Sequence, residues 1–295
     1  MYLILIIMNI IWGSSYTAQK WGLEYMAPMH MLLARLTIAF IVMFIVSSRG
    51  WPKMDRRGIA RCAGLGAIIA AAHGLGFIGI DESHAVDASI LYALEPIAAI
   101  VFARIILKER MDIWRKTALI LALAGFSVLS NMWSSNVFKN ITFWGNLILL
   151  AGVFCDGLFS PVAKPVAEKY PARVILTLAL FFAAIFILPF AIATPIRPTT
   201  FTWKPWVSIF YLAVLCSAFG WTLWVYFLRR FPVNVIAPTV FIQPIVGPFI
   251  SYFTIGEEIS ARVWFGGGII LVAIAIAVFK RKISETEIIA EAVVH

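Results

Sequence analysis

The amino-acid sequence predicts an all-α membrane protein whose ten transmembrane helices form two inverted five-helix repeats. Three observations lead to this prediction: a very apolar composition, ten long apolar segments, and a motif that occurs twice, half a chain apart. Hydrophobic residues make up 62% of the 295 residues and charged residues only 13%, and the mean hydropathy is +0.92. A soluble domain of this length cannot bury so much apolar surface, so much of it must face lipid.

The ten apolar segments are separated by glycines, prolines and clusters of charged residues. Most are about 20 residues long, enough for a helix to cross a hydrocarbon core roughly 30 Å thick. Inside that core only helices and closed barrels satisfy the backbone, and uninterrupted apolar runs favour helices over alternating strands. The expected cores are residues 2–22, 29–47, 58–80, 85–106, 114–132, 143–163, 173–193, 205–228, 233–255 and 262–280.

The repeated motif lies in the middle of two of these segments. Leu94-Glu95-Pro96 occupies the fourth segment, and Ile242-Gln243-Pro244 occupies the ninth, 148 positions later. An offset of half the chain predicts two copies of one unit, residues 1–135 and 136–283, with a cytoplasmic tail over 284–295. Each copy holds an odd number of spans, so the second copy enters the membrane upside down, which is typical of transporters.

The basic residues orient the spans. Of the 24 lysines and arginines, 18 fall on one side of the predicted membrane, which the positive-inside rule makes cytoplasmic. Both termini then lie in the cytoplasm, and we expect the protein in the inner or plasma membrane. The formal charge of +9 follows from this placement, so we expect a lipid bilayer and no nucleic acid as a partner. The 18 residues are Arg49, Lys53, Arg56, Arg57, Arg61, Arg104, Lys108, Arg110, Arg115, Lys116, Lys164, Lys169, Arg173, Arg229, Arg230, Lys280, Arg281 and Lys282.

Further motifs accompany the two prolines. Trp12-Gly13 lies in the first segment, Pro28 and Arg35 open the second, and Gly256-Glu257 follows the ninth. Over nearly the whole chain these motifs resemble the drug/metabolite transporter superfamily, in its EamA-like ten-helix branch. The resemblance implies a secondary transporter or exporter of small metabolites, often amino acids, with a substrate cavity between the two halves. The chain departs from the pattern at Asp156, which matches Gly13 of the first half.

Pro96 and Pro244 each remove one backbone donor and clash with the carbonyl four residues earlier. In lipid the freed carbonyl needs another partner, so a mid-span proline usually faces protein or a water-filled cavity. The two prolines are either paired hinges, at which the fourth and ninth helices bend between states, or fixed kinks required by packing.

Glu95 is a carboxylate near mid-membrane, and facing a polar cavity is the usual way to accommodate such a group. It could bind a substrate amine or exchange a proton, or it could lock two helices together through a hydrogen bond. Its counterpart Gln243 keeps the polar shape without the charge, so charge-dependent work would fall to the first half only.

Three further polar residues lie within the spans. His73, in a Gly/Ala-rich run, could titrate, bind an anionic group, or form an interhelical hydrogen bond. Arg35 could hold a substrate carboxylate with two hydrogen bonds, extend to the outer surface, or pair with an acidic residue. Asp156, near the centre of the sixth segment, is either a cavity residue or a structural one. This mixture of charges suits a zwitterion such as an amino acid.

Six aromatic residues are candidate walls of a substrate pocket, because rings supply apolar area and their polar tips can orient a ligand. The alternative for each is a place in the core or against lipid. Trp12 and Tyr16 share one helix face, and Trp221 and Trp224 share another. The six residues are Trp12, Tyr16, Tyr92, Trp221, Trp224 and Tyr226.

Two glutamates lie just beyond the proline-containing segments, Glu109 after the fourth and Glu257 after the ninth. Each is expected to cap the N-terminus of the helix that follows it, because free N–H groups and the helix dipole favour a carboxylate there.

The motifs that the sequence lacks narrow the function. It has no Walker A motif, no Gly-x-Ser-x-Gly, no His-Glu-x-x-His, and no metal ligands at suitable spacing from His73. We therefore expect no enzyme activity, no cofactor and no metal. The expected function is secondary transport of a small polar metabolite by alternating access, as an exporter or exchanger. A lipid-carrier flippase and a passive channel are the alternatives, and the sequence does not predict an oligomeric state.

Overall fold

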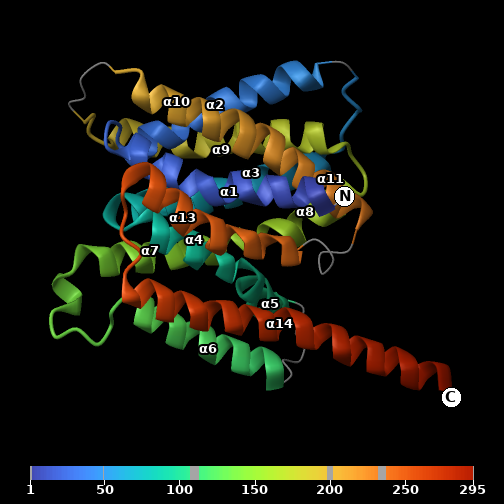
Figure 1. Cartoon of the computed structure of the whole chain (residues 1–295). Helices are drawn as coiled ribbons and strands as arrows, with labels where there is room; N and C mark the ends of the chain where they lie inside the picture. Colours follow the sequence, from blue (N-terminus) through green and yellow to red (C-terminus); the bar gives the residue numbers. More distant parts are fainter. Residues whose placement is uncertain (1, 49, 107–112, 198–201, 232–236, 295) are drawn as a thin grey trace.

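The computed structural model describes residues 2–48, 50–106, 113–197, 202–231 and 237–294, and their regular structure is helical throughout (Figure 1). The first half contains α1 (Tyr2–Leu23), α2 (Pro28–Ser47), α3 (Arg56–Glu82), α4 (Ala85–Leu91), η1 (Tyr92–Leu94), α5 (Glu95–Ile106) and α6 (Ile113–Leu129). The second half contains η2 (Val137–Lys139), α7 (Ile141–Asp156), α8 (Phe159–Ala167), α9 (Ala172–Ala193), α10 (Lys204–Phe210), η3 (Tyr211–Trp221), α11 (Thr222–Arg230), η4 (Ala237–Ile242), α13 (Gln243–Ile255) and α14 (Ala261–Val294).

These elements follow the ten predicted segments, and the prediction of an all-α membrane protein is confirmed. Within the described residues, five helical spans are long and apolar enough to cross a membrane by length and composition. They are Pro28–Ser47, Arg56–Glu82, Ile141–Ala167, Ala172–Ala193 and Lys204–Arg230. Helix starts coincide with local signals: Pro28 is the first residue of α2, and Pro171 directly precedes α9.

The Asp55 side chain caps α3 by accepting a hydrogen bond from the backbone nitrogen of Gly58 at 2.6 Å. This hydrogen bond lowers the pKa of Asp55, because it favours the ionised carboxylate. The start of α3 is thereby fixed just outside the predicted membrane.

Four of the predicted spans are broken rather than continuous. A 3₁₀ turn, η1, separates α4 from α5, and the longer η4 precedes α13. Two residues, Gly157 and Leu158, separate α7 from α8, and η3 is a π-helix between α10 and α11. Irregular backbone is tolerated at membrane depth only where it is buried in protein or lines a cavity. The breaks therefore indicate where a cavity should be sought.

The two prolines lie at these breaks, which corrects their expected place inside continuous helices. Glu95 is the first residue of α5, so Pro96 occupies the first helical turn, where its missing N–H needs no partner. Gln243 and Pro244 begin α13 in the same way after η4. In both repeats a 3₁₀ helix therefore ends and is followed directly by an α-helix, which begins at the residue before the proline. A hinge role for the two positions stays a prediction.

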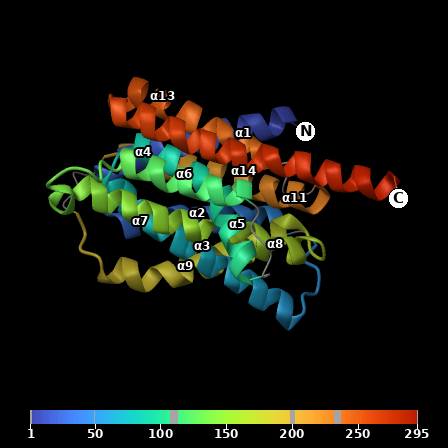
Figure 2. The ribbon, with the colours of Figure 1, turned by 90° about the horizontal axis from the view of Figure 1, so that it is seen from below.

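The helices pack in pairs that cross the boundary between the halves. Helix α3 lies against α7 and α9, α1 and α4 lie against α13, and α6 lies against α14 (Figure 2). Glycines allow the closest approaches. A Cβ atom at Gly79 would lie 2.9 Å from the carbonyl oxygen of Gly145, and one at Gly125 would lie 2.9 Å from that of Gly266. Small residues at such crossings let two backbones touch in a medium that gives little hydrophobic drive for association.

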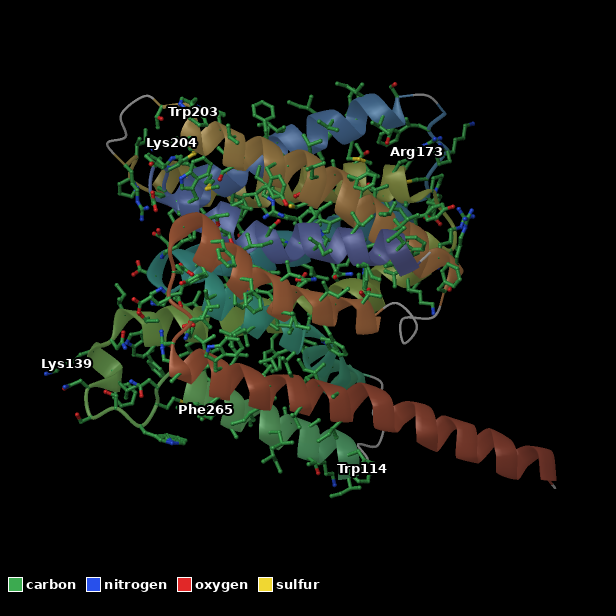
Figure 3. The ribbon with its side chains drawn as sticks, in the orientation of Figure 1. Trp114, Lys139, Arg173, Trp203, Lys204 and Phe265 are labelled. Atoms are coloured by element: carbon green, nitrogen blue, oxygen red, sulfur yellow. The ribbon has the colours of Figure 1, made fainter. Side chains whose placement is uncertain are left out.

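The two ends of the bundle carry different residues. Lys139 and Lys204 lie at one end and Arg173 at the opposite end, as the predicted orientation requires (Figure 3). The N-terminus and the C-terminal end of α14 lie toward the same end as Arg173 (Figure 1). Exposed rings at the periphery include Trp203 and Phe265, at 66% and 71% exposure. A belt of exposed apolar side chains is what lipid contact requires.

The segment expected as a tail continues the last helix. Helix α14 runs unbroken from Ala261 to Val294 and projects beyond the other helices (Figure 1). Residues 280–294 contain neither glycine nor proline and are rich in good helix formers, which explains why the helix does not end at the predicted membrane boundary.

Candidate functional site: a cavity between the two halves

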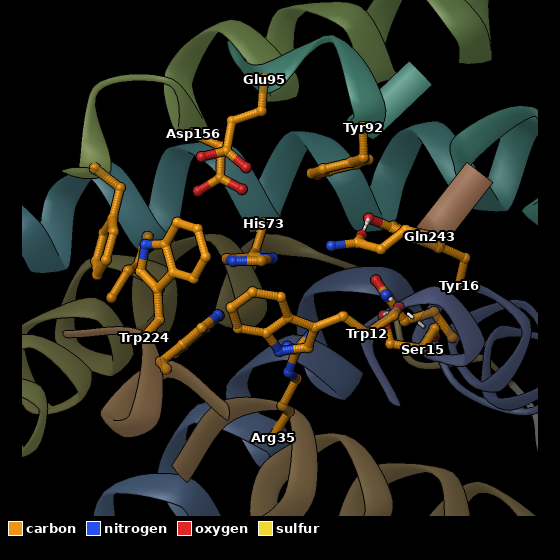
Figure 4. Close-up of a pocket in the computed structure, with 14 residues that line it drawn as sticks. Trp12, Ser15, Tyr16, Arg35, His73, Tyr92, Glu95, Asp156, Trp224 and Gln243 are labelled. Atoms are coloured by element: carbon orange, nitrogen blue, oxygen red, sulfur yellow. Dashed lines mark hydrogen bonds between the residues drawn. The ribbon is translucent and has the colours of Figure 1, made fainter. Parts of the chain in front are cut away.

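A cavity lies where the helix breaks converge, and helices of both halves line it (Figure 4). Ten of the eleven residues that the sequence singled out as binding or pocket-wall candidates are among its lining residues, and Tyr226 is the exception. The lining residues are Trp12, Ser15, Tyr16, Gln19, Arg35, Ile69, His73, Tyr92, Glu95, Asp156, Phe159, Trp221, Trp224 and Gln243.

Two carboxyl groups point toward one another at one side of this cavity (Figure 4). Glu95 is the first residue of α5, where the helix dipole favours a carboxylate, and Asp156 is the last residue of α7. Helices α5 and α7 pack together, which brings residues 61 positions apart in sequence into one acidic pair. Like charges at short range repel strongly away from water, so this pair favours a proton or a cation between its oxygens.

Arg35 enters the cavity from the opposite side (Figure 4). Its side chain is buried, with 3% of the residue exposed, so it does not extend to the outer surface. Its Nε donates a hydrogen bond to Ser217 Oγ at 2.9 Å, and its guanidinium lies over the Trp221 and Phe77 rings at 5.3 and 5.7 Å. Nη1 is buried and has no hydrogen-bond partner among the described residues. Arg35 therefore retains donor capacity inside the cavity.

A chain of neutral hydrogen bonds links α1 to the break before α13. The Tyr16 hydroxyl donates to Gln243 Oε1 at 2.9 Å, and Gln243 Nε2 donates to Asn9 Oδ1 at 2.9 Å. Asn9 Nδ2 in turn donates to Thr239 Oγ1 at 3.0 Å. Gln243 is thus held between two partners, while its counterpart Glu95 faces another acid.

The aromatic walls are held by the π-helix η3. Trp12 donates from Nε1 to the carbonyl oxygen of Cys216 at 3.0 Å and lies against Gly220, where a Cβ atom would come within 2.6 Å of that nitrogen. Trp221 stacks on His73 with ring centroids 4.8 Å apart, and Trp12 lies 5.7 Å from Trp224. The single π-helix η3 therefore positions the Trp221 ring, the Cys216 carbonyl that holds Trp12, and the Ser217 hydroxyl that holds Arg35.

Sequence reasoning missed four lining residues and included one that lies elsewhere. Ser15 and Gln19 lie on the face of α1 that carries Trp12 and Tyr16, so helical periodicity could have identified them. Ile69 and Phe159 gave no signal, because apolar residues are common throughout the spans. Tyr226 does not line this cavity: its ring centroid lies 4.1 Å from the Arg230 guanidinium, and 40% of the residue is exposed.

Glu257 caps a helix, but not the one we expected. Its carboxylate accepts hydrogen bonds from the backbone nitrogens of Ala85 at 3.0 Å and Val86 at 2.9 Å, at the start of α4. Gly256 ends α13 with a φ of 71°, and α13 packs along α4, so the turn reaches α4 before α14 begins. The capped helix therefore belongs to the other half. Glu109 lies outside the described residues.

An ion pair between a buried aspartate and a half-buried arginine lies beside this cap. Arg262 Nη2 is 3.6 Å from Asp87 Oδ2, and Arg262 Nη1 donates to the carbonyl oxygen of Leu129 at 3.0 Å. Asn146 Nδ2 also donates to Asp87 at 2.9 Å. We call Glu257, Arg262, Asp87 and the start of α4 the outer latch, since they join the two halves at the predicted outer end.

The described part of the chain holds no group of three or more His, Cys, Asp or Glu side chains that could surround a metal ion. The cavity offers instead separated positive and negative groups between aromatic rings. Such a site can bind and release a small charged molecule without changing its bonds.

Comparison with known proteins identifies the fold family. The profile of the EamA-like transporter family matches residues 1–131 and again residues 143–279, one match in each half. The chain belongs to the EamA-like transporter family. This EamA-like chain is therefore a membrane transporter rather than an enzyme.

Named relatives agree with this assignment. The chain is 25% identical over 292 residues to a probable amino-acid metabolite efflux pump of Salmonella typhimurium, covering 94% of each chain. It is 24% identical over 268 residues to a probable terminal-alkyne amino-acid exporter of Streptantibioticus cattleyicolor, covering 90% of this chain and 89% of the relative. An uncharacterised inner membrane transporter of Escherichia coli K12 is 25% identical over 280 residues, covering 90% and 87%.

A crystal structure of another protein has the same fold. It superposes with a TM-score of 0.67 at 16% sequence identity and covers 96% of this chain and 98% of that chain. At this identity the likeness concerns the fold alone.

Proposed function

We propose that this EamA-like transporter is a secondary active transporter that exports or exchanges a small polar metabolite of the amino-acid class by alternating access. It would act in the inner or plasma membrane with both termini in the cytoplasm. The observation that carries the proposal is the cavity between the halves, lined by charged and aromatic side chains at four helix breaks. Broken helices that meet at a central site are typical of inverted-repeat transporters. The names of two relatives point to amino-acid substrates.

The outer latch supports a cycle with two accessible sides. Two ion pairs join described side chains at the predicted outer end, where Arg262 meets Asp87 and Arg197 meets Asp81. These contacts join the second half to the first, so they have to part before a substrate can leave outward. The two halves would then rock around the cavity, with the breaks at Glu95 and Gln243 absorbing the bend.

The primary test is counterflow in proteoliposomes. We expect labelled amino acid outside to accumulate transiently in vesicles that are preloaded with the same unlabelled amino acid, with an initial rate that saturates. A passive channel would give a flux that neither saturates nor shows counterflow, and that result would overturn the proposal.

Glu95→Gln is expected to lower the transport rate about 10- to 100-fold, because hydrogen bonds to a charged partner contribute roughly 1.5–3 kcal/mol. The measurement is the initial rate of counterflow at a substrate concentration below the half-saturation point. Glu24→Gln is the matched control, since Glu24 is exposed in the loop after α1 and lies outside the cavity. Equal rates for the wild type and Glu95→Gln, at equal amounts of inserted protein, would remove Glu95 from the binding site.

A further inference from the structure

The charges of the cavity are separated rather than paired. The carboxyl groups of Glu95 and Asp156 lie on one side and the Arg35 guanidinium on the other, with the His73 ring between them (Figure 4). Among the described residues, no ion pair joins Arg35 to a carboxylate. Buried charges in proteins are normally paired, because an unpaired charge away from water is costly. The separation therefore calls for a molecule that carries both charges.

Arg35 has the donors for an anion. Its hydrogen bond to Ser217 uses Nε only and leaves its charge uncompensated, because a hydroxyl is neutral. The rings of Trp221 and Phe77 attract the guanidinium, but they accept no hydrogen bond from it in the observed contacts. The buried Nη1 therefore lacks an acceptor among the described residues. A planar carboxylate is the group whose two oxygens fit the guanidinium fork.

The acidic pair has the acceptors for an ammonium group. An ammonium ion carries three N–H donors, and two facing carboxyl groups can accept them while its charge relieves their repulsion. Other polar groups at the cavity are less available to bind an ammonium group, because they already have hydrogen-bond partners. Gln243 is held by Tyr16 and Asn9, and the Tyr92 hydroxyl donates to the carbonyl oxygen of Ala72 at 3.4 Å.

We propose that the cavity recognises a zwitterion at two separate positions, with its carboxylate at Arg35 and its ammonium group between Glu95 and Asp156. This inference rests on the proposed function and specifies its substrate. An organic cation without a carboxylate leaves Arg35 unpaired and is repelled by it. An organic anion without an amine leaves the two carboxyl groups facing each other. Rejection of each wrong ligand thus arises from a different side of the cavity.

The test compares three ligands on the purified full-length protein. The proteinogenic L-amino acids are first screened by thermal unfolding, since a ligand of the native state raises the apparent stability. For each amino acid that binds, its methyl ester removes the carboxylate and its N-acetyl derivative removes the ammonium group. We expect each derivative to bind about 10- to 100-fold more weakly than the amino acid. The inference is wrong if no amino acid binds at millimolar concentration, or if esters bind as tightly as free amino acids.

Two substitutions assign each end of the ligand. Arg35→Gln should remove the preference for the amino acid over its ester, while the preference over the N-acetyl derivative is kept. Asp156→Asn should do the reverse. If Arg35→Gln does not fold, Arg35→Lys keeps the charge but loses the two-bond geometry, and should reduce the preference over the ester only partly. Unchanged preferences in a folded Arg35 variant would make the residue purely structural.

The outcomes separate this inference from the proposed function. Saturable counterflow of an amino acid and its ester at equal affinity would refute the two-position site, while it would still support the proposed transport function. Tight, selective amino-acid binding without any counterflow would keep the two-position site and refute transport of that ligand.

Discussion

Arg262→Gln should lower the free energy of unfolding by about 3 kcal/mol, because it leaves a buried carboxylate without its counterion. Asp87 is 1% exposed and meets Arg262 at 3.6 Å, while Asn146 supplies only a neutral donor. The Arg262 side chain is 29% exposed, so water can reach the vacated position, and we place the loss at the lower end of the usual range of about 3–5 kcal/mol. Thermal and chemical unfolding in detergent measure it.

The rescue by a second substitution distinguishes an ion pair from simple packing. Asp87→Asn in the Arg262→Gln background removes the orphaned charge and should restore most of the lost stability. Arg197→Gln is the comparison at the same end of the molecule, since its pair with Asp81 is more exposed and should contribute less than about 1 kcal/mol. Equal losses for the two arginine variants would contradict the assignment of the buried pair as the stronger contact.

The same variant tests the proposed role of the outer latch in transport. In a background without Cys62, Cys155 and Cys216, a cysteine at Ser15 reports access to the cavity. Arg262→Gln should speed the labelling of Ser15→Cys by a membrane-impermeant thiol reagent added outside, because the variant weakens the contacts of the outer latch. Unchanged labelling in a folded variant would mean that the latch does not control access from that side.

Gly79→Val is expected to destabilise the bundle by 3 kcal/mol or more, at or above the usual range of about 1–3 kcal/mol for overpacking. A Cβ atom at this position would lie 2.9 Å from both the carbonyl oxygen of Gly145 and the backbone nitrogen of Leu149. Backbone atoms cannot move aside like the end of a flexible side chain, so α3 and α7 would have to separate. The measurements are the melting temperature and the monodisperse yield from detergent extraction.

Gly64→Val on the same helix is the matched control. Apart from the backbone of α3 itself, nothing lies within 4 Å of the position that a Cβ at Gly64 would take, and the backbone there is helical as at Gly79. The two variants share the same change in helix propensity, so their difference isolates the contact with α7. Similar melting temperatures for both would show that α3 and α7 can part at little cost.

Much of the fold could be predicted because lipid imposes a simple rule on the chain. Each span must be apolar over about 20 residues and must satisfy its own backbone hydrogen bonds. The apolar composition, and the glycines, prolines and charged clusters between segments, therefore mark the spans. The polar candidates could be predicted for the same reason. Glu95, His73 and Asp156 cannot face hydrocarbon cheaply, so they had to meet one another or a cavity.

The missed features depend on contacts between distant segments. Nothing in the sequence around Cys216 distinguishes a π-helix from an α-helix, and the residues that bond to this helix, Trp12 and Arg35, come from the first half of the chain. The expectation that Glu257 caps the helix after it was wrong for a related reason. A cap prefers any nearby helix start, and only the packing of α13 along α4 decides which start is near.

The repeated proline motif shows which features the sequence determines and which depend on the packing of the folded chain. Hydropathy and the 148-residue offset were enough to predict paired spans with a polar residue before each proline, because these are local properties of the chain. They could not predict that Glu95 faces Asp156 whereas Gln243 bonds to Tyr16 and Asn9. That difference arises from the neighbours that the folded bundle brings to each half. A carboxyl that faces a second carboxyl and an amide whose hydrogen bonds are satisfied have different charge requirements, so the asymmetry of the cavity is a property of the packing.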